Sequence, residues 1–481
     1  MIRERRRLLL ALTATAVVVA PLAWTWNGSR LPSTYSVMDM GYADYGGGPE
    51  SMTQHDTMGR SVADLTADPS RKADVSLTLT TRKERFRLAS GEGVDGYTVN
   101  GSSPGPTIRA VEGQLVEVRL VNESVPDGVT LHWHGVDVPN AEDGVAGVTQ
   151  DAIRVGESHT YRFVAEQVGT YWYHSHQVSH RQVQRGLLGA LVITPKHPDP
   201  MVRDEIALLH IYNGRQTVNG RQGALAPVDV PAGTRVRVRV INTDNGAASV
   251  WSSGSPYKVV AIDGYDVNAP TPLTDRVVRL TAGGRVDVEV VAPARVDLGG
   301  SGAIVIGAGA PGTRQPRQQV DLLSYGSPAA LPFDPAKATR RFDYSIGRRP
   351  GFVHGRPGLW WSINGHLFPD VPMYVVEEGD VVRMTIENHS RDVHPMHLHG
   401  HHAVVLSRDG VKATGSPWWV DSLDVASGHE YEIAFLADNP GVWMDHCHNL
   451  PHASQGLVAH LMYAGITEPF RVGGQADNAP E

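Results

Sequence analysis

The sequence predicts an all-β protein made of three consecutive two-sheet sandwich domains. The main observation is a strand pattern that occurs three times, at residues 112–122, 232–242 and 378–388. Each copy has a turn glycine, a strand in which apolar side chains alternate, and a closing asparagine. A content of 51 glycines and 32 prolines indicates many turns between short strands. A chain of 481 residues is also long enough for about three domains.

Further matches flank the first and third copies. Residues 97–101 precede the first copy and are similar to residues 361–365, which precede the third. Residues 161–174 follow the first copy and are similar to residues 431–446, which follow the third. Beginnings, middles and ends therefore match in the same order, and we interpret them as repeats of one β domain. Each repeat is large enough for a two-sheet sandwich.

The first 26 residues are typical of an export signal. Arginines at positions 3 and 5–7 precede an apolar run over residues 8–26. The stretch at positions 5–9, Arg-Arg-Arg-Leu-Leu, resembles the twin-arginine signal. The apolar run approaches the length of a spanning helix, so it is either a cleaved signal or an N-terminal membrane anchor. The prediction is an exported protein, secreted or attached to the cell envelope.

The remaining chain divides into a tether, three domains and a tail. Residues 27–74 are rich in Gly, Asp and Met without clear periodicity, which predicts a flexible tether. The domains are assigned to residues 75–197, 198–335 and 336–468, and residues 469–481 form a polar tail. Histidine clusters occur only in the first and third domains. The middle domain is therefore expected to be a ligand-free spacer that sets the geometry of its neighbours.

Paired histidines are the main functional signal. The His-x-His pairs are His132 and His134, His174 and His176, His397 and His399, and His446 and His448. Alternate side chains of a strand share one face, so each pair aims two imidazoles at one point. Cys447, the only cysteine, lies inside the last pair and faces the other way. A thiolate with imidazoles suits copper. The pattern predicts one thiolate copper joined through the backbone to an imidazole-rich metal cluster.

These motifs closely resemble those of the three-domain multicopper oxidases, over residues 75–468. The resemblance implies cupredoxin-like Greek-key sandwiches that hold one type 1, one type 2 and two type 3 copper ions. It also implies that oxidation of a one-electron donor is coupled to reduction of O2 to water. The implied ligands are His394, Cys447 and His452 for type 1, His132 and His397 for type 2, and His134, His174, His176, His399, His446 and His448 for type 3 copper.

The axial position of the type 1 site falls on Leu457, five residues after His452. Leucine cannot coordinate copper, and for such a three-coordinate site the resemblance implies a higher reduction potential. The alternation of side chains along a strand agrees with this division of the ligands. His394 and His397 are three residues apart and point to opposite faces, so His394 can face the thiolate while His397 faces the cluster. We expect His452 or His394 to be where electrons enter and Cys447 to pass them on to the cluster.

Cleavage of O2 also needs protons, and the donors are typically carboxylic acids. Asp143, eleven residues after the first histidine of the cluster, matches an acid that the family places beside the copper ions. A second family acid lies three or six residues beyond the cysteine, where this chain has Leu450 and Ala453. We therefore assign catalytic roles to Asp143, Cys447 and His452, and expect another group, such as a water chain, to replace the second acid.

Two classes of electron donor compete. Leu457 and the laccase-type motifs favour phenols and aromatic amines. Thioethers and imidazoles in the tether favour the soft Cu(I) ion, and with it a role in copper tolerance, unless the tether is an ordinary exported linker. Fe(II) is a further metal donor that the resemblance allows. The tether side chains in question are Met38, Met40, Met52, His55 and Met58.

Other functional classes fit the sequence less well. The net charge of −8, without a basic stripe, disfavours binding to nucleic acid. A copper nitrite reductase, built from related domains, needs far fewer histidines. Copper-free relatives that act as envelope scaffolds have lost ligands, whereas this chain has all ten histidines and the cysteine.

Overall fold

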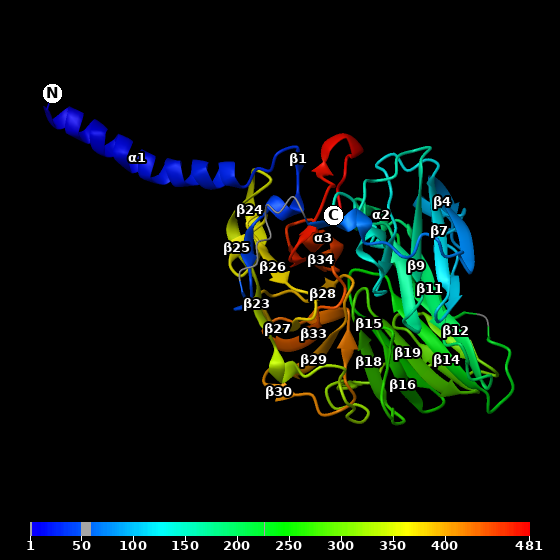
Figure 1. Ribbon diagram of the computed structural model, residues 1–481. Helices are drawn as coiled ribbons and strands as arrows, with labels where there is room; N and C mark the ends of the chain where they lie inside the picture. The colour runs from blue at the N-terminus through cyan, green and yellow to red at the C-terminus, as the bar shows by residue number, and fades with distance from the viewer. Residues whose placement is uncertain (1, 50–58, 226) are drawn as a thin grey trace.

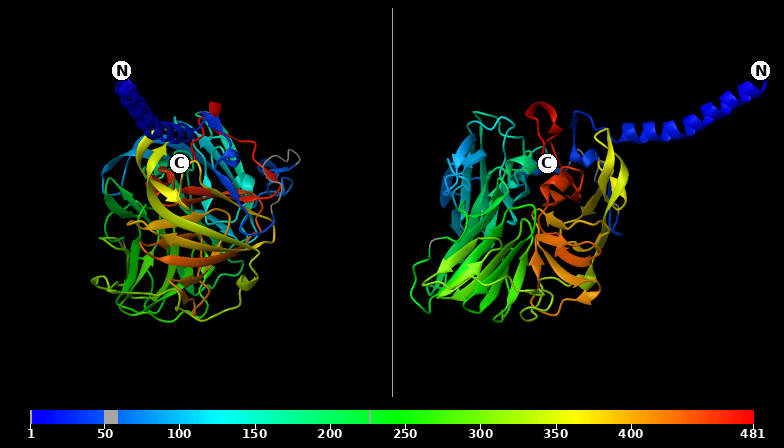
Figure 2. Two further views of the ribbon diagram at one scale, coloured as in Figure 1. Left: turned by 90° about the vertical axis from the view of Figure 1, so that its left-hand side faces the viewer. Right: turned by 180° about the vertical axis from the view of Figure 1, so that it is seen from behind.

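The structure is a computed structural model that describes residues 2–49, 59–225 and 227–481. Its strands form pairs of sheets that follow one another along the chain, and the prediction of an all-β fold is confirmed. The sheets of the first and middle domains lie on one side of the molecule, and those of the third domain lie against both (Figures 1 and 2).

The first domain has two four-stranded sheets. One has the order β5 (Gly93–Val99), β4 (Val75–Arg87), β7 (Leu115–Asn122), β9 (Ser158–Val164), and the other β6 (Ile108–Val111), β11 (Leu188–Thr194), β10 (Gly169–His174), β8 (His132–His134). A 3-10 turn, η3 (Asn140–Glu142), and a short helix, α2 (Ser179–Gln182), lie in its loops. Both are close to the histidines, because η3 follows β8 and α2 follows the end of β10.

The middle domain has a six-stranded and a five-stranded sheet. The first has the order β13 (Arg215–Val218), β12 (Val202–Tyr212), β14 (Arg235–Asn242), β19 (Arg285–Val291), β16 (Tyr257–Ile262), β17 (Tyr265–Asp266). The second has the order β21 (Ala303–Ile306), β20 (Ala294–Asp297), β15 (Ala248–Ser253), β18 (Arg276–Leu280), β22 (Gln318–Gln319). Its core is mainly valine, as expected for strands buried between two sheets.

The third domain is the largest. Its eight-stranded sheet has the order β25 (His366–Leu367), β24 (Arg356–Ile363), β23 (Arg340–Val353), β27 (Val381–Asn388), β33 (Glu430–Leu436), β29 (Ala403–Arg408), β30 (Val411–Lys412), and β31 (Trp419–Val420) pairs with β29. The facing sheet has the order β2 (Tyr42–Asp44), β26 (Pro372–Val376), β35 (Val458–Tyr463), β34 (Val442–Cys447), β28 (His394–Leu398), β32 (Ser422–Val425). The 3-10 turn η4 (Pro335–Lys337) precedes this domain, and helix α3 (Leu450–Ala453) follows β34.

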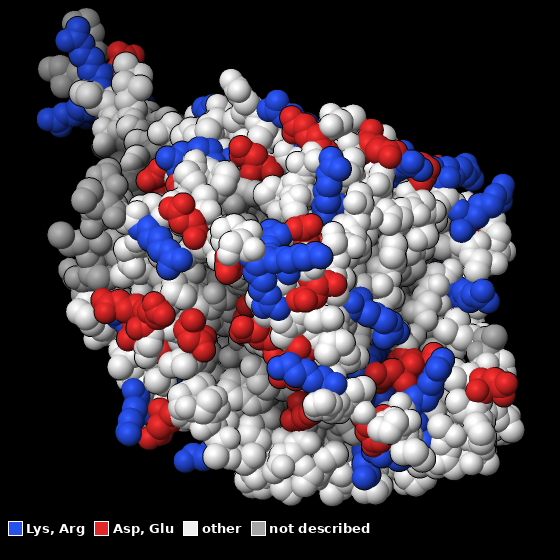
Figure 3. Space-filling model, turned by 45° about the vertical axis from the view of Figure 1, so that its right-hand side comes forward, with Lys and Arg blue, Asp and Glu red and all other residues white. Residues whose placement is uncertain are grey.

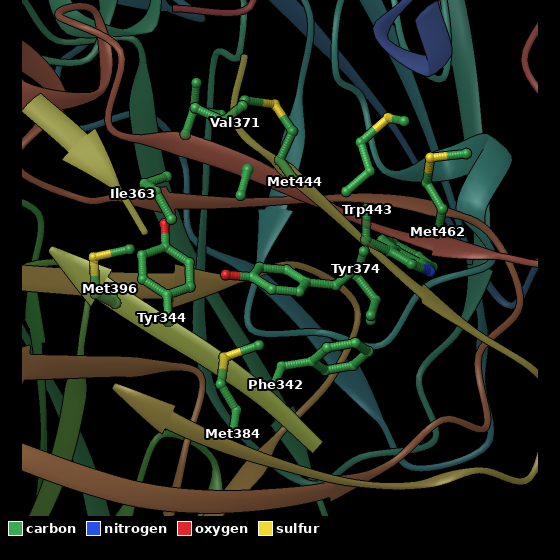
Figure 4. Close-up of a cluster of buried hydrophobic side chains, with 14 of the residues drawn as sticks. Phe342, Tyr344, Ile363, Val371, Tyr374, Met384, Met396, Trp443, Met444 and Met462 are labelled. Atoms are coloured by element: carbon green, nitrogen blue, oxygen red, sulfur yellow. The ribbon is translucent and has the colours of Figure 1, made fainter. Parts of the chain in front are cut away.

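Aromatic rings and methionines fill the space between the two sheets of the third domain (Figure 4). Phe342 and Tyr344 from β23 meet Tyr374 from β26, with ring centroids 4.9 and 5.8 Å apart. Met384 and Met396 lie beside these rings and fill irregular gaps. This packed core fixes β28 and β34, the two strands that carry the histidines of this domain.

The repeated sequence pattern corresponds to one structural position. Strands β7, β14 and β27 each pair in parallel with the first strand of their domain and antiparallel with a later one. Their alternate apolar residues are buried at matching positions: Val116, Val118 and Leu120; Val236, Val238 and Val240; Val382, Met384 and Ile386. Sequence periodicity therefore located a central strand of each domain.

The segment predicted as a flexible tether, residues 27–74, is instead packed against the body in its described parts. Strand β2 pairs in parallel with β26, and Val37 and Met40 are buried in the core of the third domain. Strands this short show no readable periodicity, which is why the sequence pattern missed them. The other elements are β1 (Thr34–Tyr35), η1 (Val37–Asp39), β3 (Arg60–Ser61) and η2 (Val62–Asp64). Met52, His55 and Met58 lie outside the described residues.

The N-terminal apolar run forms helix α1 (Ile2–Gly28), which projects from the body (Figures 1 and 2). Residues 3–28 of this helix are long and apolar enough to cross a membrane, and none of that stretch is buried. An exposed apolar helix at the N-terminus is consistent with a signal sequence.

The C-terminal residues, predicted as a polar tail, return to the body. Strand β36 (Ile466–Thr467), at the end of the predicted third domain, pairs with β3. Within the predicted tail, β37 (Val472–Gly473) pairs with β1, and η5 (Gly474–Ala476) follows. The Oδ1 atom of Asn478 accepts a hydrogen bond from the backbone N–H of Ala152, 2.8 Å away in the first domain. On the face drawn in Figure 3, acidic and basic side chains are interspersed.

Candidate metal centre

Eight histidines from two domains meet at one buried point. In the first domain, β8 and β10 are neighbours and place His132 opposite His174. In the third domain, β28 and β34 are neighbours and place His397 opposite His446. The other four members are two residues further along each strand or its following loop. The full set of buried imidazoles is His132, His134, His174, His176, His397, His399, His446 and His448.

A second, smaller group lies on the other face of β34. The Sγ atom of Cys447 is 3.7 Å from Nδ1 of His394 and 3.8 Å from Nδ1 of His452. The two Nδ1 atoms are 3.3 Å apart. His452 comes from α3, whose short turn folds the chain back toward the thiol. One thiol and two imidazole nitrogens thus converge, as blue-copper chemistry requires.

Leu457 borders this group. Its carbonyl oxygen accepts a hydrogen bond from the backbone N–H of Cys447 at 3.1 Å, and its side chain is fully buried in the third-domain core. A leucine side chain has no donor atom for a metal. The position predicted to be axial is therefore a packing residue next to the thiol.

The ring nitrogens of the eight-histidine cluster point at one another. Nε2 of His132 and Nε2 of His397 are 3.5 Å apart. Nε2 of His446 is 3.1 Å from Nε2 of His399 and 3.5 Å from Nε2 of His176. Two buried nitrogens this close repel one another if both carry protons. If neither carries a proton, both are hydrogen-bond acceptors without a donor. A shared cation resolves both problems.

The remaining three histidines of the cluster carry orphaned nitrogens. Nδ1 of His134, Nε2 of His174 and Nε2 of His448 are buried and have no hydrogen-bond partner among the described residues. Buried polar atoms normally have partners. Gly283 packs directly against two of these rings. A Cβ added at this position would lie only 2.9 Å from the rings of both His134 and His448. A metal coordinated by these nitrogens would satisfy them.

Asp143, the residue that we expect to take part in proton delivery, lies directly behind the cluster. Its Oδ1 is 3.1 Å from Nδ1 of His132, and its Oδ2 is 2.9 Å from Nδ1 of His399. It follows η3 and precedes Gly144, whose φ of +74° and position against the backbone of Leu131 require glycine. Asp143 therefore holds two imidazoles from different domains, His399 through its carboxylate and His132 through its backbone carbonyl, which lies 2.9 Å from Nδ1.

A buried ion pair behind the cluster was not found from the sequence. Asp421, in the loop between β31 and β32, has its Oδ1 3.1 Å from Nε2 of His134. The guanidinium of Arg285, from the middle domain, binds both carboxylate oxygens of Asp421. Neither residue belongs to a motif, and 136 positions separate them in the sequence. No local pattern could have brought them together.

Glu481 was also missed. Leu450 and Ala453, the two positions at which the family acid is absent, are buried and apolar. The Glu481 carboxylate lies in this region instead, where Oε2 accepts a hydrogen bond from Oγ of Ser179 at 2.8 Å. Its Oε1 is 3.3 Å from Nδ1 of His446, and burial raises the pKa of Glu481 to about 8. A carboxyl group from the predicted tail thus reaches the cluster.

Burial controls the charge of the ligand atoms. Desolvation, and then the neighbouring imidazoles, hold the pKa values of His174, His176 and His448 well below the usual range. The pKa of His394 falls to about 3 for the same reasons. These imidazoles are therefore neutral and have lone pairs available for a metal. Burial raises the pKa of the Cys447 thiol, and a bound cation offsets this by stabilising the thiolate.

The donor set fits copper. A thiol with two imidazoles, and a separate cluster supplied only by imidazoles, matches the soft and borderline ligands that copper prefers. The cluster nitrogens fall into overlapping groups of three, which suits several ions rather than one. His446 and His448 flank Cys447, so the two groups are joined by peptide bonds alone.

Comparison with known proteins agrees with this chemistry. Residues 80–198 and 335–464, together more than half of the chain, match two families described as multicopper oxidase. Laccase-1 of Botryotinia fuckeliana is 28% identical over 452 residues, which cover 78% of this chain and 80% of that protein. The multicopper oxidase MmcO of Mycobacterium tuberculosis is 27% identical over 464 residues, covering 82% and 88% respectively.

Solved structures support the same assignment. The multi-copper oxidase from Pseudomonas thermotolerans superimposes with a TM-score of 0.68 at 27% identity, covering 82% of this chain and 100% of that one. The fold of Fet3p, described as a multicopper oxidase that functions in iron import, superimposes with a TM-score of 0.69 at 20% identity, covering 81% and 90%. With both histidine-bearing domains matched and both ligand groups assembled, the chain belongs to the multicopper oxidase family, copper-dependent oxidoreductases that use O2.

Proposed function

We propose that this enzyme is laccase-like and takes electrons from phenols and aromatic amines. The observation that carries the proposal is the small group formed by the Cys447 thiol and the imidazoles of His394 and His452. It lies beside Leu457, which cannot coordinate a metal. A site without a thioether has a high potential and can oxidise phenols, which are weak reductants. Two of the methionines that favoured Cu(I) are engaged elsewhere: Met40 is buried in the core and Met38 packs against it.

We assign each ligand from the contacts of its ring. His394, Cys447 and His452 hold type 1 copper, and His132 and His397 hold type 2 copper through Nε2. The type 3 ions take His176, His399 and His446 through Nε2 on one side, and His134 through Nδ1 with His174 and His448 through Nε2 on the other. The other nitrogen of most of these rings bonds a carboxylate or a carbonyl, which fixes the tautomer.

Bound copper supplies reversible one-electron chemistry and, at the cluster, four-electron reduction of O2 to water. The chain provides the path between the two sites. Cys447 is joined by single peptide units to His446 and His448, so electrons need no jump through space. His446 and His448 contact different parts of the cluster. Nε2 of His446 lies beside His176 and His399, whereas the ring of His448 lies beside the rings of His134 and His174.

His452 provides the contact for the donor. It is partly exposed, whereas His394 is fully buried. Trp361 covers both imidazoles, with ring centroids 4.5 Å from His452 and 4.6 Å from His394. Asn449 contacts Nε2 of His452 at 3.3 Å. A flat aromatic donor can therefore approach the His452 edge, while water is kept from the thiol.

The main experiment compares two donors in an O2-consumption assay. We expect kcat/KM for a dimethoxyphenol to exceed that for chelated Cu(I). A combined Met52→Ser, His55→Gln and Met58→Ser variant should leave both values within about twofold, because these side chains are not needed for phenol oxidation. Deletion of the whole segment is unsuitable, because it would remove β2 and the buried Val37 and Met40.

The control for that variant is Met201→Ser, which removes an exposed methionine outside the segment. A preference for Cu(I) that the triple variant loses and Met201→Ser retains would contradict the proposal. It would instead support the alternative, a cuprous oxidase that acts in copper tolerance through residues 52–58. An isolated protein without stoichiometric copper would favour the copper-free scaffold.

The axial position gives a second prediction. Leu457→Met should place a thioether beside Cys447 and lower the reduction potential of the type 1 copper by about 60 mV or more, a tenfold change in equilibrium for one electron. Redox titration of the blue absorption measures this directly. Leu457→Ile is the matched control, since it keeps an apolar side chain of the same volume. A potential that changes equally in both variants would show a packing effect only.

We further propose export by the twin-arginine route, with α1 as the signal. The supporting features are Arg5 and Arg6, which lie in α1 before its apolar run, and a metal centre assembled from two domains, which suits export of a folded protein. A Lys-Lys replacement of this pair should retain the protein in the cytoplasm. Export that is unaffected by the replacement would rule this route out.

A further inference from the structure

We propose that Arg285 is a positioning residue for the trinuclear copper site: through Asp421 it fixes the orientation of His134 and His397. The inference rests on the ligand assignment proposed above. It gives the middle domain, predicted to be a spacer without ligands, a direct part in building the metal centre.

The first step is the contact between Arg285 and Asp421. Arg285 begins strand β19 and is fully buried. Its Nη1 donates to Oδ1 of Asp421 at 2.7 Å and its Nη2 to Oδ2 at 2.5 Å, while Nε donates to the carbonyl of Thr170 at 3.0 Å. This two-pronged geometry is the strongest that a guanidinium forms with a carboxylate. It holds the Asp421 carboxylate plane in one orientation.

The second step runs from Asp421 to the histidines. Its Oδ1 accepts from Nε2–H of His134 at 3.1 Å, and its backbone carbonyl accepts from Nδ1–H of His397 at 2.9 Å. A neutral imidazole carries one proton, so these bonds leave Nδ1 of His134 and Nε2 of His397 as lone-pair atoms. These are the two nitrogens that face the cluster. Their rings stack at 3.7 Å, so a shift of one moves the other.

Each of the three domains contributes one part of this arrangement. His134 and Thr170 come from the first domain, Arg285 from the middle domain, and Asp421 from the third. The neighbouring Gly283 approaches the cluster closely, and its carbonyl accepts from Nε1–H of Trp172 at 3.0 Å. The turn that precedes β19 therefore forms one wall of the metal site. Removing the charge of Arg285 should therefore disturb the histidine cluster and leave the type 1 site intact.

Other charged groups at this point do not replace Arg285. Asp263 lies 3.5 Å from its Nη1 and adds a second carboxylate. His402 lies 3.3 Å from Oδ2 of Asp421, and its pKa is raised because it also contacts Asp137. Burial alone would raise the pKa of Asp421, but Arg285 and three histidine hydrogen bonds hold it well below the usual range. Arg285 is the only one of these groups that binds both oxygens of Asp421.

The test is the copper content and spectrum of Arg285→Met, purified after copper loading. We expect the affinity for cluster copper to fall 10–100-fold, as for other outer partners of metal ligands. Copper should drop toward one ion per chain, with loss of the type 2 paramagnetic resonance signal and retention of the blue absorption. Arg285→Lys, which keeps the charge but has a single donor nitrogen in place of the two-pronged guanidinium, should recover part of the cluster copper.

The matched control is Arg239→Met. Arg239 is another buried arginine of the same sheet, paired with Asp287 and bonded to Oγ1 of Thr170, but it does not contact Asp421. It should keep all four coppers. Equal loss in both variants, or full cluster copper in Arg285→Met, would overturn the inference. If Arg285→Met fails to fold, Asp421→Asn must show the same selective loss. A wild-type protein without blue absorption would instead contradict the proposed function.

Discussion

Replacing Cys447 with serine is expected to remove the blue absorption of the protein and to reduce O2 consumption on the order of 10³-fold or more. Among the described residues, the Cys447 thiol is the only sulfur atom placed with the imidazole nitrogens as a metal ligand, and the chain has no other cysteine to replace it. A serine hydroxyl keeps the shape of the side chain but is not a soft ligand. Absorption spectra and oxygen-electrode rates measure the two effects.

The other coppers should remain in Cys447→Ser, because the cluster ligands are all imidazoles. Metal analysis should therefore find about three ions per chain with an intact type 2 resonance signal. Met384→Leu is the control for loss of a buried sulfur, since Met384 lies in the core of the same domain (Figure 4). If Cys447→Ser kept its colour and turnover, the thiol group would not be the site where electrons enter.

The parts of the metal centre that could be predicted from sequence depend on short-range geometry. Side chains alternate between the two faces of a strand, and this can be read from neighbouring positions in the sequence. The opposite orientations of Cys447 and its two flanking histidines, His446 and His448, were therefore predictable. Asp421 meets Arg285 across 136 positions, and Glu481 approaches His446 from the far end of the chain. Such contacts depend on how domains pack, which a single sequence does not display.

The N-terminal segment shows the same limit in another form. Its Gly- and Met-rich composition predicts a tether, yet β2 adds an edge strand beside β26 and places Val37 and Met40 in the core. A three-residue strand gives no periodic signal, and its stability comes from the sheet that it joins. Met40 is thus better explained by packing than by copper binding.

The trinuclear site should depend most strongly on Asp143. We expect Asp143→Asn to slow reoxidation by O2 about 10²-fold, within the range of a lost acid–base group. The Asp143 carboxylate accepts a hydrogen bond from Nδ1–H of His399 through Oδ2, and its Oδ1 lies 3.1 Å from Nδ1 of His132, whose N–H also bonds the Asp143 carbonyl. An asparagine amide keeps the shape of this side chain but loses the negative charge and turns one of the two oxygens into a donor group. Asp143 also contacts both His132 and His399, which we propose as ligands of type 2 and type 3 copper respectively.

Stopped-flow kinetics separate the two half-reactions. Anaerobic reduction follows the loss of blue colour and should be nearly unchanged in Asp143→Asn, because Asp143 does not contact Cys447, His394 or His452. Reoxidation by O2 should carry the whole effect. Glu142→Gln is the control: its carboxylate is the neighbouring buried acid, but it accepts from the backbone N–H of Arg162 and faces away from the cluster. Equal slowing of reduction and reoxidation would show that Asp143 maintains the fold and has no specific part in proton delivery.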